Sequence, residues 1–229
     1  MSSTLEQIFD KVRRRVTGAG LNINVNQYAL AIYTAINWAQ EEFCTVRWRF
    51  LQKKKEITTQ SGVNVYDLFD NAGPGFYDFG TLRDVWINDG DGNKIELVRA
   101  QVQDIEILGA AMDNGLPNYF ALSGVTTDAG WSTVVPAIWL GIPTPDDEYT
   151  VTVYYYRRLP ELSGASTVSD VCAVYRDDPL VEGAVFRFML DVAPQAANPE
   201  SFYRAMIAAQ KVLPYDGPMY PQKLQEKET

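Results

Sequence analysis

Histidine is absent from the 229-residue sequence, and several other patterns of catalytic chemistry are absent with it. Histidine is the commonest general base in enzymes and a frequent transition-metal ligand, so its absence disfavours most hydrolase mechanisms. The sequence also lacks a glycine-rich phosphate loop, a GxSxG elbow and an HExxH motif. Chemistry based on carboxylates alone stays open, although most Asp and Glu side chains are solvated surface groups. We therefore expect no catalytic turnover, no cofactor and no metal site.

Cysteine is scarce, and long apolar runs are missing. Cys44 and Cys172 are far apart in sequence and have no CxxC spacing, so two buried free thiols are favoured over a single disulfide. No run approaches the ~20 apolar residues of a membrane helix. The N-terminal residues MSSTLEQIFDKVRRR carry charges where a signal peptide would be apolar. These features predict a protein made in the cytosol without membrane contact.

Charge is distributed unevenly along a composition that is otherwise typical of a folded protein, with 46% hydrophobic residues and a net charge of -9. Residues 61–175 hold sixteen acidic and five basic side chains. This excess disfavours tight, sequence-independent DNA binding, and it suits a surface over which DNA slides. Basic runs at 13–15 and 53–55 could contact nucleic acid, but favourable placement at a helix end and protection of an edge strand explain them better.

Two helices are predicted near the N-terminus. The first begins with a capping box of Ser3 and Glu6, carries an apolar stripe and ends in the glycines of residues 17–20. The second covers about 26–46 and is apolar on two sides, which indicates packing within one subunit or sharing with a neighbouring copy. The second flank is the candidate self-association surface, and it consists of Tyr28, Ala31, Ala35 and Trp38.

Two further helices and a tail are predicted at the C-terminal end. One helix begins with Asp178 as cap, and the other begins after Asn198 and stops before Pro214. Residues 214–229 contain three prolines, which predicts an extended arm. The candidate contacts of this arm with a portal or a neighbouring copy are Tyr215, Met219, Tyr220 and Pro221. A tail packed back on its own subunit is the alternative.

The segment between the two helical parts is predicted to be β structure. Residues 88–94 separate two apolar pieces and predict a hairpin rather than a calcium loop, because Lys94 and Ala100 stand where that loop needs glycine and glutamate. A short helix is expected at 101–112. The acidic cluster at 146–148 is interpreted as a solvated turn rather than a metal or catalytic site. The strands around it indicate a β-meander.

The fold class that these elements predict is α+β. A helical bundle formed by the N- and C-terminal helices carries an inserted, mainly antiparallel β subdomain. We expect N-terminal helices at 1–48, the β subdomain at 49–175, C-terminal helices at 176–213 and the extended tail at 214–229.

Residues 116–124 (LPNYFALSG) and 137–163 (AIWLGIPTPDDEYTVTVYYYRRLPELS) form the most specific stretch of the sequence. Their order of strand, P-x-P, acid pair, tyrosine-rich strand and L-P-x-L resembles the β core of podophage head-to-tail adaptors, the tail tubular protein A type. The layout of terminal helices, with Trp38 and Trp48, is similar to the family as well.

The resemblance implies a structural protein that forms a ring, typically dodecameric, between the portal and the tail nozzle of a short-tailed phage. Expected partners are the chain itself, the portal protein, the tail nozzle protein and genomic DNA that passes through the lumen without tight binding. The chain would belong to the virion and assemble in the bacterial host cytoplasm. A carbohydrate-binding or glycan-cleaving tail component is the alternative, supported by tyrosine-rich strands and abundant carboxylates.

Overall fold

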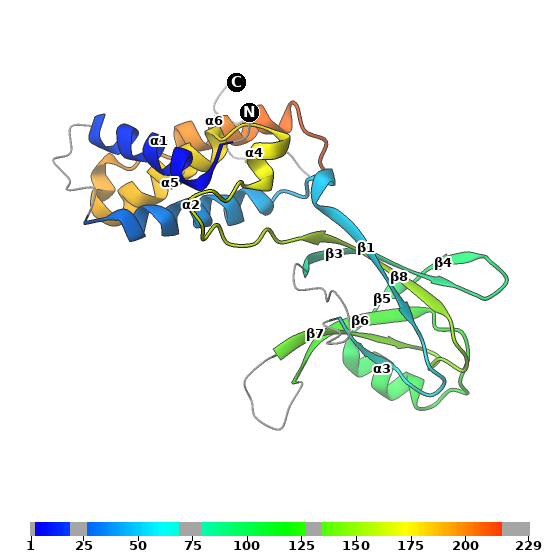
Figure 1. Ribbon diagram of the computed structural model, residues 1–229. Coiled ribbons are helices and arrows are strands. Elements are labelled where there is room, and N and C mark those ends of the chain that lie inside the picture. The colour runs from blue at the N-terminus through cyan, green and yellow to red at the C-terminus, as the bar shows by residue number, and fades with distance from the viewer. Residues whose placement is uncertain (1–2, 19–26, 69–78, 127–133, 217–229) are drawn as a thin grey trace, which may run out of the picture. The chain divides into compact units, whose positions relative to one another are not determined.

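The computed structural model describes residues 3–18, 27–68, 79–126 and 134–216 (Figure 1). The chain divides into two compact units: unit 1 comprises Met1–Leu51 and Arg158–Thr229, and unit 2 comprises Gln52–Arg157. Helices from both ends of the chain belong to unit 1, and all the strands of the described residues belong to unit 2. The α+β class predicted from the sequence is confirmed.

The described residues of unit 1 form five α-helices: α1 (Leu5–Gly18), α2 (Ala29–Cys44), α4 (Asp170–Val174), α5 (Asp178–Val192) and α6 (Glu200–Gln210). Two short 3-10 helices, η1 (Arg49–Leu51) and η2 (Pro194–Ala196), accompany them. Apolar residues at spacings of three and four give each long helix one buried face, as Leu5, Ile8, Val12 and Val16 do in α1. Helix α5 packs against α1, α2 and α6, so it lies at the centre of this unit.

Helices α2 and α5 approach each other closely at a glycine. A Cβ atom built on Gly183 of α5 would lie 2.8 Å from the Cβ of Ala39 and 2.9 Å from Cε2 of Phe202. Both neighbours are fully buried, so neither has free space to move into. The small residues at this contact therefore set the distance between the two helix backbones.

The segment after unit 2 is held along α2 by two amide side chains. The backbone N–H of Leu162 donates to the Asn37 side chain over 2.8 Å, and Gln40 Nε2 donates to the carbonyl of Pro160 over 2.9 Å. Ser169 donates to the other amide atom of Gln40. Residues 158–175, which the turn-rich sequence placed with the β subdomain, therefore lie in unit 1 and include α4.

Unit 2 consists of two four-stranded sheets that share one core. The first has the order β1 (Gln52–Thr58), β8 (Thr150–Arg157), β3 (Phe79–Asn88), β4 (Lys94–Glu96). The second has the order β2 (Val65–Asp67), β7 (Val134–Gly141), β6 (Tyr119–Thr126), β5 (Val98–Arg99). Neighbouring strands are antiparallel except for β5 and β6. The core side chains alternate along their strands and come from both sheets: Leu68, Val85, Ile87, Leu97, Phe120, Ile138, Leu140, Val151, Val153 and Tyr155.

The predicted β-meander is only partly correct. Strands β6 and β7 do form an antiparallel pair, but β8 joins the other sheet, between β1 and β3. The turn at Pro143–Tyr149 therefore carries the chain from one sheet to the other. Within β8, the side chains of Val151, Val153 and Tyr155 all point into the core.

The hairpin and the short helix predicted in this segment are both present. Strands β3 and β4 pair in register, Asn88 opposite Lys94, and the loop between them has two glycines with positive φ, Gly90 and Gly92. Helix α3 (Val102–Gly109) packs against β6 and β7. Its Ile105 lies over Gly141, where an added Cβ would be only 2.5 Å from Cγ2 of Ile105.

Candidate interaction surfaces

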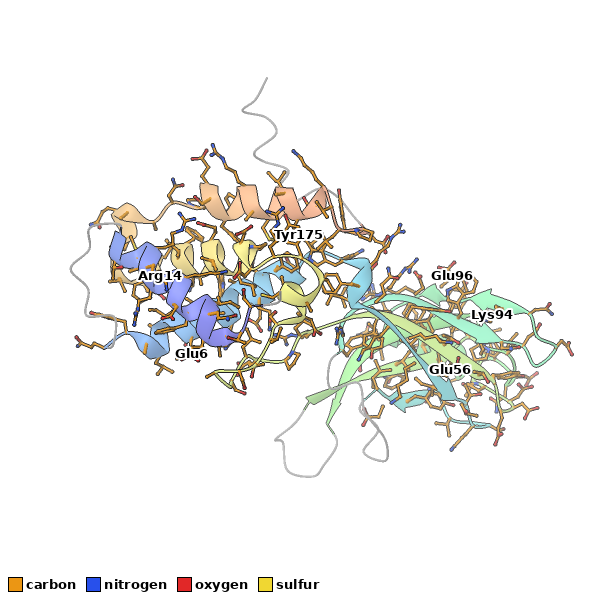
Figure 2. The ribbon with its side chains drawn as sticks, turned by 45° about the horizontal axis from the view of Figure 1, so that its top comes forward. Glu6, Arg14, Glu56, Lys94, Glu96 and Tyr175 are labelled. Atoms are coloured by element: carbon orange, nitrogen blue, oxygen red, sulfur yellow. The ribbon has the colours of Figure 1, made fainter. Side chains whose placement is uncertain are left out.

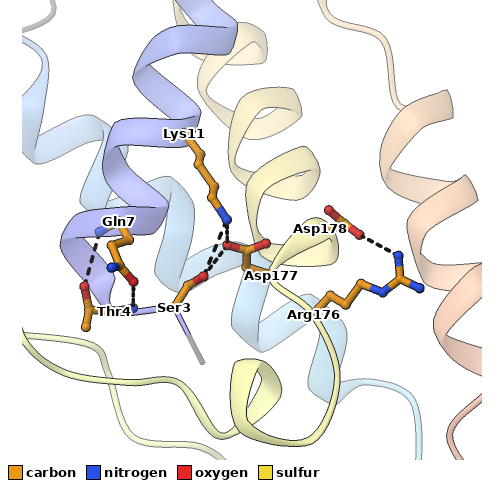
Figure 3. A network of polar contacts seen from close by, with 7 residues as sticks. All are labelled: Ser3, Thr4, Gln7, Lys11, Arg176, Asp177 and Asp178. Carbon is orange, nitrogen blue, oxygen red and sulfur yellow. Dashed lines mark hydrogen bonds and ion pairs between the residues drawn. The ribbon is translucent and has the colours of Figure 1, made fainter. Parts of the chain in front are cut away.

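A polar network joins the start of α1 to the start of α5 (Figure 3). The hydroxyl of Ser3 donates to Asp177 over 2.6 Å, and the Lys11 ammonium forms an ion pair with the same carboxylate oxygen. Partial burial acts to raise the pKa of Asp177, but the hydrogen bonds from Lys11 and Ser3 and the charge of Lys11 outweigh it and lower that pKa. The network ties two helices that are far apart in sequence.

Two helix caps predicted from the sequence are wrong. The capping box of α1 is formed by Thr4 and Gln7, whose side chains bond to each other's backbone N–H over 3.3 and 3.0 Å. The predicted pair, Ser3 and Glu6, has the same spacing but lies one residue earlier in the chain. Asp178 does not cap α5, since it lies within the helix and Asp177 precedes it.

A groove of about 350 Å³ lies beside this network. It is lined by Lys11, Arg14, Arg15, Asp177, Asp178, Val181 and Glu182. Most of these charges are matched within the chain, since Arg15 contacts Glu182 over 3.0 Å and Asp178 contacts Arg176 over 4.0 Å. The basic run at 13–15 therefore forms part of a mixed-charge surface of unit 1, on which Figure 2 shows Arg14.

The second flank of α2 packs within the chain. The clearest case is Trp38, whose ring lies 6.2 Å from that of Phe186 and 5.9 Å from that of Phe202. Tyr28 meets Phe188 edge to face at 6.0 Å. The structure thus brings this flank against α5 and α6. Self-association through these residues stays a prediction.

 Of the two alanines of this flank, Ala35 is buried and Ala31 is partly exposed.

The start of the C-terminal tail is anchored on its own chain. Tyr215 forms an isolated antiparallel bridge with Trp48, and their rings meet edge to face at 5.9 Å. The flanking backbone bonds run from Arg49 N–H to the carbonyl of Pro214 and from Asp216 N–H to the carbonyl of Arg47, over 3.0 and 2.8 Å. Asp216 also forms an ion pair with Arg49 over 3.0 Å.

Tyr215 therefore matches the alternative of a tail packed back on its own subunit. The other three predicted contact residues of the arm, Met219, Tyr220 and Pro221, lie outside the described residues. The proline pattern of the tail gave no sign of the bridge, because the partner strand is a single residue, Trp48, far away in sequence.

Negative charge is concentrated in unit 2. Residues 52–157 contain seven Lys or Arg and fifteen Asp or Glu, a balance of -8, so the remaining residues contribute only -1 to the total of -9. Figure 2 shows Glu56, Lys94 and Glu96 among the side chains of this unit. The lysines at 53–55 lie on β1, an edge strand of its sheet, as predicted. Charges on an edge strand discourage unwanted strand pairing.

The acidic residues at 146–148 lie in the turn between β7 and β8. The Tyr149 hydroxyl donates to the Asp146 carboxylate over 2.5 Å, and this bond, together with a small desolvation effect and the charges of Asp146 and Asp147, raises the pKa of Tyr149 to about 12. The backbone N–H of Glu148 donates to the Asp147 side chain over 2.7 Å. Within the described ranges, no group of three or more Asp, Glu, Cys or His side chains is arranged to hold a metal ion.

The two cysteines are free thiols, and Cys172 is buried while Cys44 is partly exposed. Burial raises the pKa of Cys172 to about 12, with a further contribution from the charge of Asp177. The predicted burial is correct for Cys172 but not for Cys44. Separately, none of the helices in the described part of the chain has the length and apolar character needed to cross a membrane.

The chain thus combines a helical unit with a strongly acidic β unit. Residues 3–219 match the family model described as the SU10 adaptor protein, and the chain belongs to this family. The family indicates a phage adaptor, a structural component of the virion that contacts other capsid or tail components. No curated protein matches the chain significantly.

Proposed function

We propose that the chain is the head-to-tail adaptor of a short-tailed phage, of the tail tubular protein A type, and that it forms a ring, typically dodecameric, between portal and tail nozzle. The observation that carries this proposal is the match of residues 3–219 to a phage adaptor family, because it covers both units of the chain. Assembly would take place in the host cytoplasm before the chain becomes part of the virion.

The charge of unit 2 supports a role beside a DNA channel. A balance of -8 within residues 52–157 repels phosphate, so genomic DNA would pass such a surface without tight binding. Unit 1 is nearly neutral and exposes a mixed-charge groove beside α1 and α5. In our proposal unit 1 docks on the portal, and unit 2 supplies the platform that receives the nozzle.

The tail and α2 supply the proposed contacts with the portal and with neighbouring copies. Tyr215 fixes the start of the tail on Trp48, so an arm formed by Met219, Tyr220 and Pro221 would act from a fixed point. The conformational entropy lost on binding is then smaller than for a wholly free chain end. Ring contacts through α2 would use the accessible parts of Tyr28 and Ala31, because Trp38 contacts Phe186 and Phe202.

The test is to mix the purified chain with the purified portal protein of its phage and to examine the product by electron microscopy and mass photometry. The proposal predicts a second ring stacked on the portal ring, with as many copies as the portal symmetry accommodates. One or two copies per portal, or no complex at concentrations up to tens of micromolar, would contradict it. Polysaccharide cleavage by the pure chain would instead favour the glycan-directed alternative.

A further inference from the structure

Helix α3 presents large apolar side chains to solvent. Ile107 is 70% exposed, and Leu108 and Met112 are each 50% exposed. We define these three residues as the α3 surface. The opposite side of the helix packs on the rest of unit 2. There Ile105 and Gly109 are buried against the end of β7 and the turn that follows it. The core of unit 2 therefore leaves the α3 surface without a partner inside the described part of the unit.

The three exposed side chains lie within six residues of one another, at the end of α3 and in the turn that follows it. This turn keeps Met112 close to the end of the helix, since its N–H bonds to the carbonyl of Gly109. Elsewhere in the described ranges, exposed large apolar residues stand singly along the sequence. Adjoining exposed aliphatic side chains are typical of a surface that a partner covers.

The charged side chains of α3 and of the turn that follows it are all negative. Asp104, Glu106 and Asp113 are exposed, and none of them forms an ion pair or a side-chain hydrogen bond with another described residue. No Lys or Arg occurs between Arg99 and Arg157. Asp104 lies one turn before Leu108, so a carboxylate continues the same side of the helix. A complementary partner therefore combines apolar side chains with Lys or Arg.

A second copy of this chain fits the patch poorly. Two α3 surfaces facing each other would bring six carboxylates together without a cation. Many of the chain's own cations are also engaged, since ten Lys and Arg side chains of the described residues form ion pairs within the chain. These two observations favour a partner with a different sequence.

We propose that the α3 surface docks an amphipathic segment of another virion protein, one that carries Lys or Arg beside its apolar side chains. The inference rests on the proposed function, because an adaptor needs a surface for a protein other than itself. It adds the location of that surface and the chemistry of its partner.

The test is photo-crosslinking in assembled phage particles. The chain is supplied with p-benzoylphenylalanine at position 107, or at the exposed hairpin position 91 as a control. The inference predicts that position 107 crosslinks to another virion protein, through a segment that mass spectrometry shows to contain Lys or Arg within about one helical turn. A crosslinked dimer of the chain, no crosslink, or a segment without cations would overturn it.

A second variant tests the charge argument with the same readout. Asp104→Asn, Glu106→Gln and Asp113→Asn together remove the negative charge while leaving the apolar patch intact. Three exposed charge pairs at about 0.5 kcal/mol each correspond to about a tenfold loss of affinity, so the crosslink yield at limiting chain concentration should fall several-fold. An unchanged yield contradicts the charge argument. Absence of the chain from purified particles, measured by immunoblot, would instead refute the proposed function and the inference with it.

Discussion

Replacing Gly183 by alanine tests the packing between α2 and α5 at its closest point. The new Cβ would lie 2.8 Å from the Cβ of Ala39 and 2.9 and 3.0 Å from two ring atoms of Phe202. These distances are shorter than ordinary carbon contacts of about 3.5–4.0 Å. The Ala39 methyl is fixed to the backbone, so the two helices have to separate or the buried Phe202 ring has to turn.

The magnitude follows from two opposing effects. Overpacking of a dense core costs about 1–3 kcal/mol, whereas Gly→Ala inside a helix gains up to about 1 kcal/mol of helix propensity. We therefore expect Gly183→Ala to lose about 1–2 kcal/mol, which corresponds to a fall in Tm of about 2–8 °C for a chain of this size.

The assay is thermal and urea unfolding followed by circular dichroism at 222 nm, which reports chiefly on the helices of unit 1. Gly18→Ala is the matched control, because Gly18 also lies in a helix and an added Cβ meets nothing within 4 Å. The control should be neutral or slightly stabilising. A Gly183→Ala protein as stable as the wild type would refute the argument that this contact is closely packed.

Three further predictions concern the tail, the polar network and the thiols. Removing residues 217–229 should leave the stability of the chain unchanged. Removing 214–229 should lower the free energy of unfolding in urea by about 1–2 kcal/mol, because the ring contact and the bridge of Tyr215 are lost. Equal stability of the two truncated chains would contradict the anchoring of the tail by Tyr215. Because the pKa of Asp177 is lowered in the folded chain, its carboxylate stabilises the fold above the unfolded pKa, and this stability is lost as pH falls through the folded pKa. Below about pH 4 the wild type should therefore lose more stability than Asp177→Asn. Parallel pH profiles of the two proteins would contradict this prediction. Cys172 should react with Ellman's reagent only after unfolding, so Cys172→Ser should leave the native thiol count unchanged and lower the denatured count by one.

The sequence predicted those elements whose signals are local. The apolar stripe from Leu5 to Val16 predicted α1, and the proline and asparagine before residue 200 predicted the start of α6, where Asn198 does accept a hydrogen bond from the N–H of Glu200. The two glycines between β3 and β4 likewise marked the hairpin. In each case neighbouring residues are sufficient to determine the structure.

The features that sequence reasoning missed depend on residues distant in the chain. Strand β8 leaves the sheet of β6 and β7 because its partners are β1 and β3, and strand alternation says nothing about which sheet a strand joins. Asn37 and Gln40 hold the segment after β8, a role that depends on residues more than a hundred positions away. The three-residue spacing of Val102, Ile105 and Leu108 predicted the short helix, but of these three only Ile105 is buried and Leu108 is half exposed.

We propose that this chain forms the ring that connects portal and tail, and the most direct test is cryo-electron microscopy of the portal vertex in assembled particles. Such a ring predicts density for the folds of unit 1 and of unit 2 directly below the portal, repeated around the axis, with the acidic β units beside the DNA path. A vertex without this density, or a particle in which the chain lies elsewhere, would contradict the proposed ring.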